Sequence, residues 1–294
     1  MGRKTEKEHR RNPWVFLAPL LVFAVGAGIF LYPAVSNFLA ERAQTDVIRS
    51  YQAAVDESDR QKLEAEWQKA EEYNENLAGD PVHDPFVMGS GYVLPDNYEE
   101  VLNLNGDGVM GYLEIPKIDV ELPVYHGTSE KVLEKGAGHL EATALPIGGK
   151  NRHPVLSAHR GLPSAELFTQ LDEMEVGDRF YLSVLDETLA YEVDKITVIE
   201  PEELEFLTPE KDRDLLTLLT CTPYGVNTHR LLVRGTRVPY EEAEPTKTGK
   251  GSERDVSWRA QYLRAALTGA ALLAVLGLIV FGWCRRRGRH RDSD

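Results

Sequence analysis

The chain has 294 residues, 42% of them hydrophobic and 27% charged, and its formal net charge is −14 at pH 7. Basic side chains dominate both ends, so the region between residues 13 and 284 carries about −20. This acidic middle region has no basic stripe, which argues against nucleic acid as a partner and is typical of a soluble exposed domain.

Two uncharged apolar runs frame the chain. The first, within residues 12–40, contains WVFLAPLLVFAVGAGIFLYPAV, and the second covers residues 265–284, so each is long enough to cross a bilayer. Basic clusters lie outside both runs, which predicts cytoplasmic termini and an extracellular region at 41–262. Two alternatives stay open: a cleaved signal peptide for the first run and a buried core helix for the second.

Residues 39–78 predict a helix after the first span, because apolar side chains recur at three- and four-residue intervals. The segment DESD at 56–59 is expected to interrupt it. A loop rich in Gly, Pro and Asp follows from Gly79, and loops of this length are often lids or binding loops. The spacing of NLNGDGVMGYLE at 103–114 is similar to that of a calcium loop, but its leading Asn favours a turn into a strand.

Short strand-like segments fill the rest of the middle region. They are rich in β-branched and aromatic residues and are separated by turn signals, with one helix expected around Ser164–Met174. This pattern predicts an all-β barrel or sandwich of roughly 130 residues. The expected strands are VMGYLEIP, VELPVYHG, HPVLSAH, DRFYLSVL, LAYEVDKITVI, LLTLLTC and HRLLVRGTRV.

Cys221 is the only cysteine between the two predicted spans. An extracellular compartment is oxidising, so a retained single thiol there favours a working nucleophile over packing. It ends the apolar run LLTLLTC, which predicts a buried strand whose last residue meets solvent at a rim. The alternative is a small hydrophobe in the core.

A thiol needs a neighbouring imidazole or cation to be a thiolate at neutral pH. His159 is the favoured partner because it lies between the strand-like PVLSA and the loop RGLP; His139 is a rival, and spacing does not exclude His229. Arg230 begins a strand after the loop TPYGVNTH and could stabilise an oxyanion or hold a substrate carbonyl. A surface role for this arginine is equally open.

The segments TLLTC, LSAHRGLPSAELF, GDGVMGYLEIPKI, GAGHLEATALPIGG and CTPYGVNTHRLLVRG together resemble the sortase family. The resemblance spans roughly residues 80–240 and is closest to class C, the pilus-assembling sortases, which have two membrane segments and a lid with an Asp-Pro-aromatic motif. Asp84, Pro85 and Phe86 match that lid motif. Two departures are Ser157-Ala158, where Thr-Gly or Ser-Gly is more usual, and Phe86, where Trp is frequent.

The resemblance implies a mainly β fold, an eight-stranded barrel, with Cys221 as nucleophile, His159 as acid/base partner and Arg230 as the oxyanion or substrate-positioning cation. In the lid, Asp84 would approach Arg230 and Phe86 would cover Cys221. The implied function is a membrane-anchored transpeptidase that cleaves a Leu-Pro-x-Thr-Gly-type signal and joins it to a pilin lysine. No cofactor or metal is expected. The alternatives are anchoring of surface proteins to the cell wall precursor, a hydrolytic thiol protease and a non-catalytic pilus-assembly scaffold.

The expected organisation follows from these assignments. It comprises a cytoplasmic tail at 1–12, a transmembrane helix at 13–38, an extracellular helical segment at 39–80, a lid and connecting loop at 81–107, the catalytic barrel at 108–240, a linker at 241–262, a second transmembrane helix at 263–284 and a basic cytoplasmic tail at 285–294.

Overall fold

The computed structural model describes residues 14–77, 97–240 and 269. The chain divides into two units, residues 1–242 and 243–294. Only Gly269 of the second unit is described, so the predicted second span at 263–284 lies outside the described residues except for this glycine. The account below concerns the first unit.

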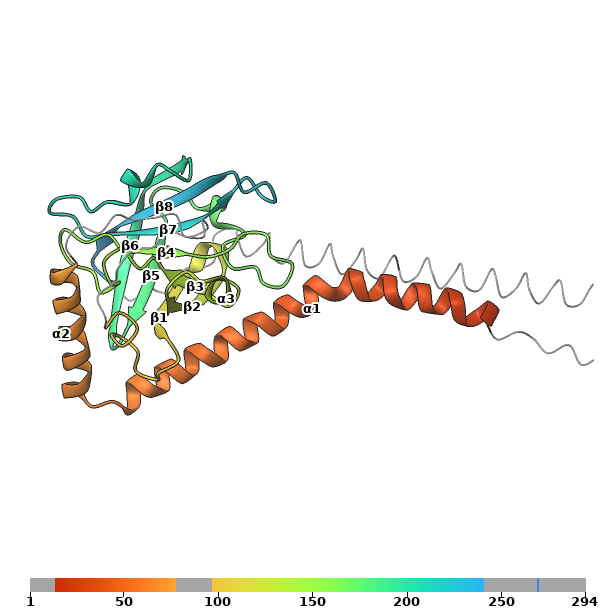
Figure 1. Ribbon diagram of the computed structural model, residues 1–294, viewed down its shortest axis with the longest axis horizontal. Coiled ribbons are helices and arrows are strands. Elements are labelled where there is room, and N and C mark those ends of the chain that lie inside the picture. The colour runs from red at the N-terminus through yellow and green to blue at the C-terminus, as the bar shows by residue number, and fades with distance from the viewer. Residues whose placement is uncertain (1–13, 78–96, 241–268, 270–294) are drawn as a thin grey trace, which may run out of the picture. The chain divides into compact units, whose positions relative to one another are not determined.

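Eight strands close into a barrel in the order β1-β2-β3-β4-β7-β8-β6-β5, which confirms the mainly β fold and the eight-stranded barrel (Figure 1). Two of the pairings, β2 with β3 and β4 with β7, are parallel, and the others are antiparallel. The strands are β1 (Val109–Ile115), β2 (Val120–His126), β3 (Ala137–His139), β4 (Val155–Ser157), β5 (Arg179–Val184), β6 (Glu187–Ile199), β7 (Leu215–Thr222) and β8 (His229–Val238).

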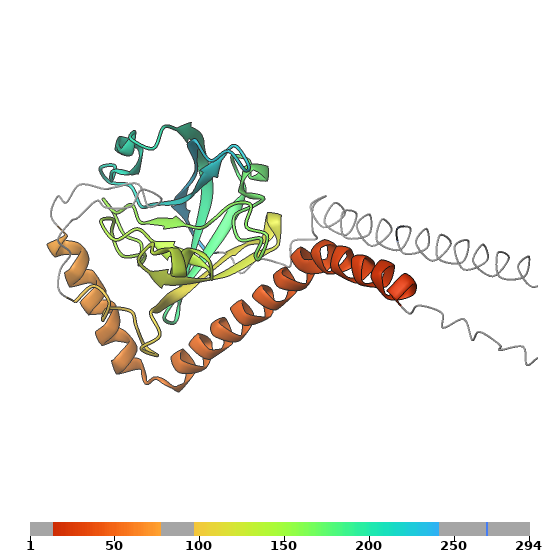
Figure 2. The same cartoon turned by 45° about the vertical axis from the view of Figure 1, so that its right-hand side comes forward.

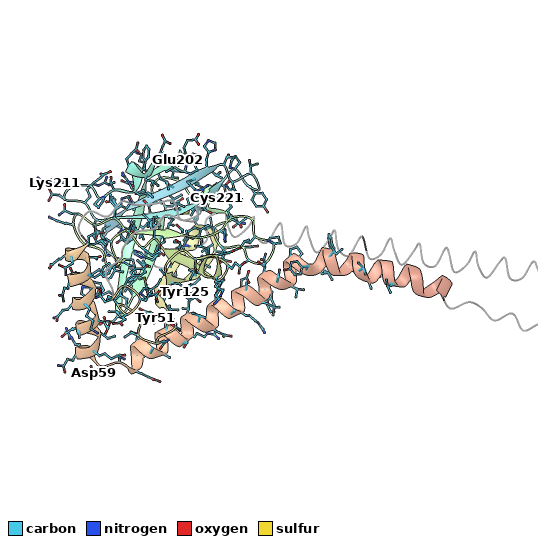
Figure 3. The ribbon with its side chains drawn as sticks, in the orientation of Figure 1. Tyr51, Asp59, Tyr125, Glu202, Lys211 and Cys221 are labelled. Atoms are coloured by element: carbon cyan, nitrogen blue, oxygen red, sulfur yellow. The ribbon has the colours of Figure 1, made fainter. Side chains whose placement is uncertain are left out.

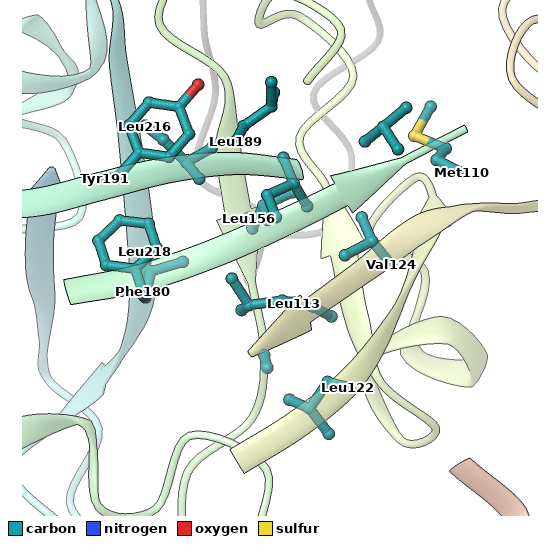
Figure 4. Close-up of a cluster of buried hydrophobic side chains, with 14 of the residues drawn as sticks. Met110, Leu113, Leu122, Val124, Leu156, Phe180, Leu189, Tyr191, Leu216 and Leu218 are labelled. Carbon is teal, nitrogen blue, oxygen red and sulfur yellow. The ribbon is translucent and has the colours of Figure 1, made fainter. Parts of the chain in front are cut away.

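The interior of the barrel is filled by alternate side chains from these strands. Successive side chains of a strand point to opposite faces, so Leu216 and Leu218 of β7 enter the same core as Phe180 of β5 and Tyr191 of β6 (Figure 4). The two aromatic rings stack with their centroids 5.7 Å apart. Gly235 of β8 lies beside them, and a Cβ there would come within 2.7 Å of the Phe180 ring.

Strand β7 is buried on both faces, which explains its nearly continuous apolar sequence. Leu219 points away from the barrel interior, into a second cluster with Leu232 of β8 and Ile199 of β6. The connection from β6 to β7 covers this cluster with the short helix η3 (Leu204–Leu207), whose Leu207 is buried. The outer face that carries Leu219 is therefore the face on which Cys221 also lies.

Two helices precede the barrel. Helix α1 (Trp14–Glu57) is continuous from the apolar run into the region that packs against β1 and β2, and α2 (Arg60–Asn76) follows it (Figure 2). The Asp59 carboxylate accepts a hydrogen bond from the Lys62 amide and caps the start of α2. The interruption predicted at 56–59 is thus confirmed. One described helix segment, Phe23–Glu57, is long and apolar enough to cross a membrane.

The helix expected around Ser164–Met174 is wrong. The structure has only a 3-10 turn there, η2 (Leu171–Glu173), preceded by turns in which Leu167 has a φ of 45°. The Phe168 amide donates to the His159 carbonyl instead of to a helical partner. The pattern also missed β3, which has only three residues, and α3 (Glu130–Leu133); the remaining short helix is η1 (Pro116–Ile118).

Tyr51 fixes α1 to the barrel. Its hydroxyl donates to the Met110 carbonyl at 2.9 Å and accepts from the Leu185 amide at 2.8 Å, and its side chain is buried (Figure 3). Tyr51→Phe would leave two buried backbone groups without a partner, so we expect a loss of about 2–4 kcal/mol in the free energy of unfolding. Urea unfolding checks this, with Tyr181→Phe as the control; an unchanged stability would contradict it.

Candidate active site

Cys221 and Arg230 lie directly opposite each other on neighbouring strands. Cys221 is the penultimate residue of β7, and the antiparallel register pairs it with Arg230 near the start of β8. Paired residues point to the same face of a sheet, so the thiol and the guanidinium share the outer face of the barrel. Figure 3 shows Cys221 in this part of the barrel.

Both side chains are largely buried, with Cys221 7% and Arg230 6% exposed. The Nη1 atom of Arg230 donates to the carbonyls of Asn227 and His229 at 3.1 and 3.2 Å. These bonds tie the guanidinium to the β7–β8 loop, which holds it beside the end of β7. A fixed cation in a poorly solvated position is suited to stabilise developing negative charge.

His159 lies beside the same end of β7 as Arg230, but on the opposite edge of that strand, because β4 and β8 flank β7 on its two sides. The parallel register pairs Ser157 of β4 with Leu219 of β7, and two further bonds extend the pairing by one residue: Ala158 N to Leu219 O at 3.2 Å, and Thr220 Oγ1 to Ala158 O at 2.7 Å. The next residue of each segment is His159 and Cys221. Neighbouring strands lie about 5 Å apart, so the three candidates form a row across the segment that continues β4, strand β7 and strand β8.

The imidazole of His159 is half-buried, and burial lowers its pKa. The negative charges of Glu134 and Glu130 oppose this effect. These carboxylates lie in and just after α3, a feature that the sequence patterns did not identify. Burial therefore favours the neutral form of the ring, which can accept a proton.

The rival histidines have other surroundings. His139 is fully buried in β3, with Nδ1 2.9 Å from Tyr98 Oη and Nε2 2.8 Å from the Ala144 carbonyl, and burial lowers its pKa to about 3. His229 precedes Arg230, so it points to the opposite face of β8, where Nε2 lies 3.2 Å from Glu200 Oε1. Among the described histidines, only His159 combines partial exposure with a position beside Cys221.

Other sequence assignments fall elsewhere. Asp84, Pro85 and Phe86 lie outside the described residues. The calcium-like segment forms a turn, in which Asn103 Oδ1 accepts from the Gly108 amide and Asp107 Oδ1 accepts from the Val109 amide. Within the described ranges, no group of three or more His, Cys, Asp or Glu side chains is placed to hold a metal ion.

A cavity of about 190 Å³ opens on the same outer face as Cys221 but does not include it. Its closest approach along β7 is Thr217, four residues before Cys221, and the Leu219 cluster lies between them. The cavity walls carry charges of both signs. They are formed by Lys195, Thr197, Glu205, Phe206, Thr208, Glu210, Thr217, Leu232 and Arg234.

Comparison with known proteins identifies the family of this chain. The Sortase domain family matches residues 113–238. Sortase C of Streptococcus pneumoniae has 48% sequence identity, and the similarity covers 67% of this chain and 99% of that structure with a TM-score of 0.63. The chain belongs to the sortase family. Sortases are cysteine transpeptidases.

Other sortases extend the comparison. Sortase C1 of Streptococcus agalactiae is 42% identical, with a TM-score of 0.61 and coverage of 70% of this chain and 98% of that structure. Sortase D of Bacillus subtilis is 34% identical over 131 residues, which are 44% of this chain and 63% of the relative. The match thus spans less than two thirds of Sortase D. The structural neighbours are class C sortases, which agrees with the resemblance found in the sequence.

Proposed function

We propose that this sortase is a membrane-anchored transpeptidase that cleaves a Leu-Pro-x-Thr-Gly-type sorting signal through a thioester on Cys221 and joins it to a lysine amine of a pilin. The row of Cys221 on β7, Arg230 on β8 and His159 just after β4 carries the proposal, because it supplies a nucleophile, a proton carrier and a fixed cation. The S. pneumoniae neighbour was described for its pilin substrate specificity, and the S. agalactiae Sortase C1 belongs to Pilus Island 1.

In the first half-reaction, His159 takes the proton of the Cys221 thiol, and the resulting thiolate attacks the threonine carbonyl. This forms a tetrahedral oxyanion, to which the Arg230 guanidinium offers N–H donors. The carbon–nitrogen bond to glycine then breaks, and the His159 imidazolium gives its proton to the departing amine. A thioester and a neutral imidazole remain. The energy of the peptide bond is retained in the thioester, so the next step needs no activated co-substrate.

In the second half-reaction, the lysine amine attacks the thioester carbonyl. The neutral His159 takes a proton from the attacking nitrogen, the carbon–sulfur bond breaks, and Cys221 leaves as a thiolate. The product is an isopeptide bond, and the thiolate–imidazolium pair is restored. Attack by water instead of the amine would give hydrolysis, so exclusion of water separates ligation from proteolysis.

The membrane assignment is part of the proposal. Helix α1 supplies one apolar segment, and the sequence supplies a second at 263–284, of which the structure describes only Gly269. With basic residues outside both, we infer a two-pass protein with cytoplasmic termini, an extracellular catalytic barrel and a linker at 241–262. Its partners would be pilin or surface-protein substrates with a C-terminal sorting signal.

The proposed lid gives one prediction. If Asp84, Pro85 and Phe86 close the site through an attraction between Asp84 and Arg230, Asp84→Ala should raise the rate at which a thiol reagent labels Cys221. The matched control is Asp96→Ala, which removes a carboxylate outside the proposed contact. Equal labelling rates in Asp84→Ala and the parent chain would contradict an occluding lid.

The carboxylates near His159 give a second prediction. Because Glu134 and Glu130 raise the pKa of the imidazole against the effect of burial, Glu130→Gln/Glu134→Gln should lower that pKa further. The acid limb of kcat/KM for thioester formation should therefore move to lower pH, and its basic limb should move less. A peptide assay across pH 4–10 measures this; an acid limb that stays in place would show that it does not report on His159.

Intact mass of the full chain in detergent micelles, mixed with a sorting-signal peptide, tests the function itself. We expect an adduct of the acyl fragment that requires Cys221, is absent in Cys221→Ala, and disappears on addition of a lysine-bearing pilin peptide with formation of an isopeptide product. Transfer only to a cell wall precursor amine would support wall anchoring instead. Pilin binding that survives in Cys221→Ala, without any adduct in the parent chain, would indicate a scaffold.

A further inference from the structure

Arg160 is a buried arginine beside the candidate site that none of the steps above uses. Its side chain is only 7% exposed. A guanidinium remains charged inside a protein, so its burial is stable only where hydrogen bonds replace the lost water. The contacts of Arg160 therefore show which segments of the chain its side chain holds together.

The guanidinium joins two separate segments. Nη2 lies 2.5 Å from Asp172 Oδ2, and Nε donates to the Thr169 carbonyl at 3.1 Å, both in the segment that follows His159. Nη1 donates to Thr222 Oγ1 at 3.2 Å, and the guanidinium carbon lies 5.9 Å from the centroid of the Tyr224 ring, both at the end of β7 and just beyond it. One rigid, planar group thus bonds to both sides of the site.

The positions of these bonds along the chain are informative. Arg160 directly follows His159, and Thr222 directly follows Cys221. On the near side, β4 and β7 are held in register up to Ala158 and Thr220. On the far side, the bond from Arg160 to Thr222 reconnects the two segments, so His159 and Cys221 lie between two fixed points.

A second interaction supports this geometry. The Gly161 amide donates to Thr169 Oγ1 at 3.1 Å, and the Phe168 amide donates to the His159 carbonyl at 3.1 Å. The loop after His159 is therefore folded back on itself, and the Arg160 guanidinium closes it through Thr169 and Asp172. This arrangement restrains the backbone of His159.

Arg152 offers a comparison within the same chain. Its side chain is 16% exposed, and it donates to the Gly148 carbonyl at 2.8 Å and pairs with Glu71, so it is a partly buried arginine that also has a carboxylate partner. Its bonds join α2 to a loop and touch neither His159 nor Cys221. Arg152 thus shows that an arginine can stabilise this fold without connecting the segments that carry His159 and Cys221.

We propose that Arg160 is a positioning residue that holds the imidazole of His159 in register with the thiol of Cys221. It acts through Thr222 on one side and through Thr169 and Asp172 on the other, and it does not contact the substrate. Its role in acyl transfer rests on the proposed function, whereas its control of the His159–Cys221 geometry is testable without any peptide substrate.

The substrate-free test measures alkylation of Cys221 by iodoacetamide in the full chain. Cys284→Ser makes Cys221 the only thiol, because the chain has two cysteines. A correctly placed imidazole promotes thiolate formation, so we expect Arg160→Gln to lower the alkylation rate constant at pH 7 about tenfold. In a His159→Ala background the same change should lower the alkylation rate constant less than about twofold. If Arg160 acts through His159, its substitution has little left to change once the imidazole is gone, so the two effects do not add.

The outcomes of this cycle are distinct. An equal loss in both backgrounds would overturn the proposal, because it would mean that Arg160 affects Cys221 without acting through His159; no loss in either would overturn it as well. Arg160→Lys should give an intermediate rate, since lysine keeps the charge but lacks the planar fork. Arg152→Gln is the control: it should lower the thermal midpoint without changing the alkylation rate.

If Arg160→Gln fails to fold, Thr222→Val removes the single bond to β7 and leaves the guanidinium in place. The same cycle with His159→Ala then applies, with a smaller expected loss of about threefold. With a sorting-signal peptide, Arg160→Gln should lower kcat for thioester formation about 10- to 100-fold and change KM less than about twofold. If the parent chain forms no thioester, the proposed function fails, while the alkylation cycle still decides the role of Arg160.

Discussion

His159→Ala is expected to lower the rate constant for thioester formation by about 10²- to 10⁴-fold, the usual contribution of a positioned general acid. The loss should fall on kcat rather than KM, because the proton is needed only when the amine departs. The alanine chain should also lose the acid limb of its pH profile, since the half-buried imidazole whose pKa burial lowers is no longer present.

Rapid mixing with a sorting-signal peptide, followed by intact mass, measures this rate constant. His229→Ala is the matched control: it also removes a histidine near the β7–β8 loop, but one whose side chain points to the other face of β8. We expect it to retain at least half of the parent rate. A His159→Ala chain with near-parental acylation would show that another group protonates the leaving amine.

The strands were largely predictable because each carries its own signal. β1, β5 and β8 alternate or concentrate apolar residues over six to ten positions, and the structure places them within two residues of the expected segments. β3 has three residues, two of them Ala and Gly, so no local pattern marks it. The segment 164–174 contains helix-forming residues, yet the Phe168 amide bonds to the His159 carbonyl and the neighbouring amides form only three-residue turns within the segment.

The residues of the candidate site were predictable individually, but their proximity was not. Arg230 follows Cys221 after a short hairpin, so their pairing is local. His159 lies 62 positions before Cys221, and only the parallel pairing of β4 with β7 brings them together. The contrast between His139 and His159 depends on burial, to which residues distant in sequence contribute; Tyr98, for example, contacts His139 from 41 positions away. No sequence pattern marks Arg160, and the role proposed for it is visible only in its contacts with Thr222 and Asp172.

Acidification from pH 7 to pH 5 is expected to lower the free energy of unfolding by about 2 kcal/mol through His139 alone. The pKa of this imidazole falls from about 6.5 to about 3 on folding, because it is fully buried between β3, Tyr98 and the Ala144 carbonyl. Below pH 6.5 the His139 imidazole is protonated in the unfolded chain, whereas in the folded chain it stays neutral until the pH approaches 3. Stability is therefore present above pH 6.5 and is lost as the pH falls toward 3.

Other groups modify this dependence in a defined direction. His153 is buried against the Thr208 carbonyl and Thr217 Oγ1, and burial lowers its pKa too, so it adds to the loss in acid. Asp194 has a lowered pKa beside Arg234 and Arg213, although burial opposes the shift, and it adds a further loss at lower pH. These contributions make the acid sensitivity a property of the barrel rather than of the active site.

Urea unfolding of the full chain at pH 7 and pH 5 separates the His139 contribution from the rest. His139→Gln removes the titration but keeps a side chain that both donates and accepts hydrogen bonds, so it should lower stability at pH 7 and lose about 2 kcal/mol less than the parent chain on acidification. His229→Gln, at a partly exposed position, should show the parental dependence. If His139→Gln and the parent chain lose the same stability between pH 7 and pH 5, the pKa of His139 is the same in the folded and the unfolded chain, and burial does not lower it.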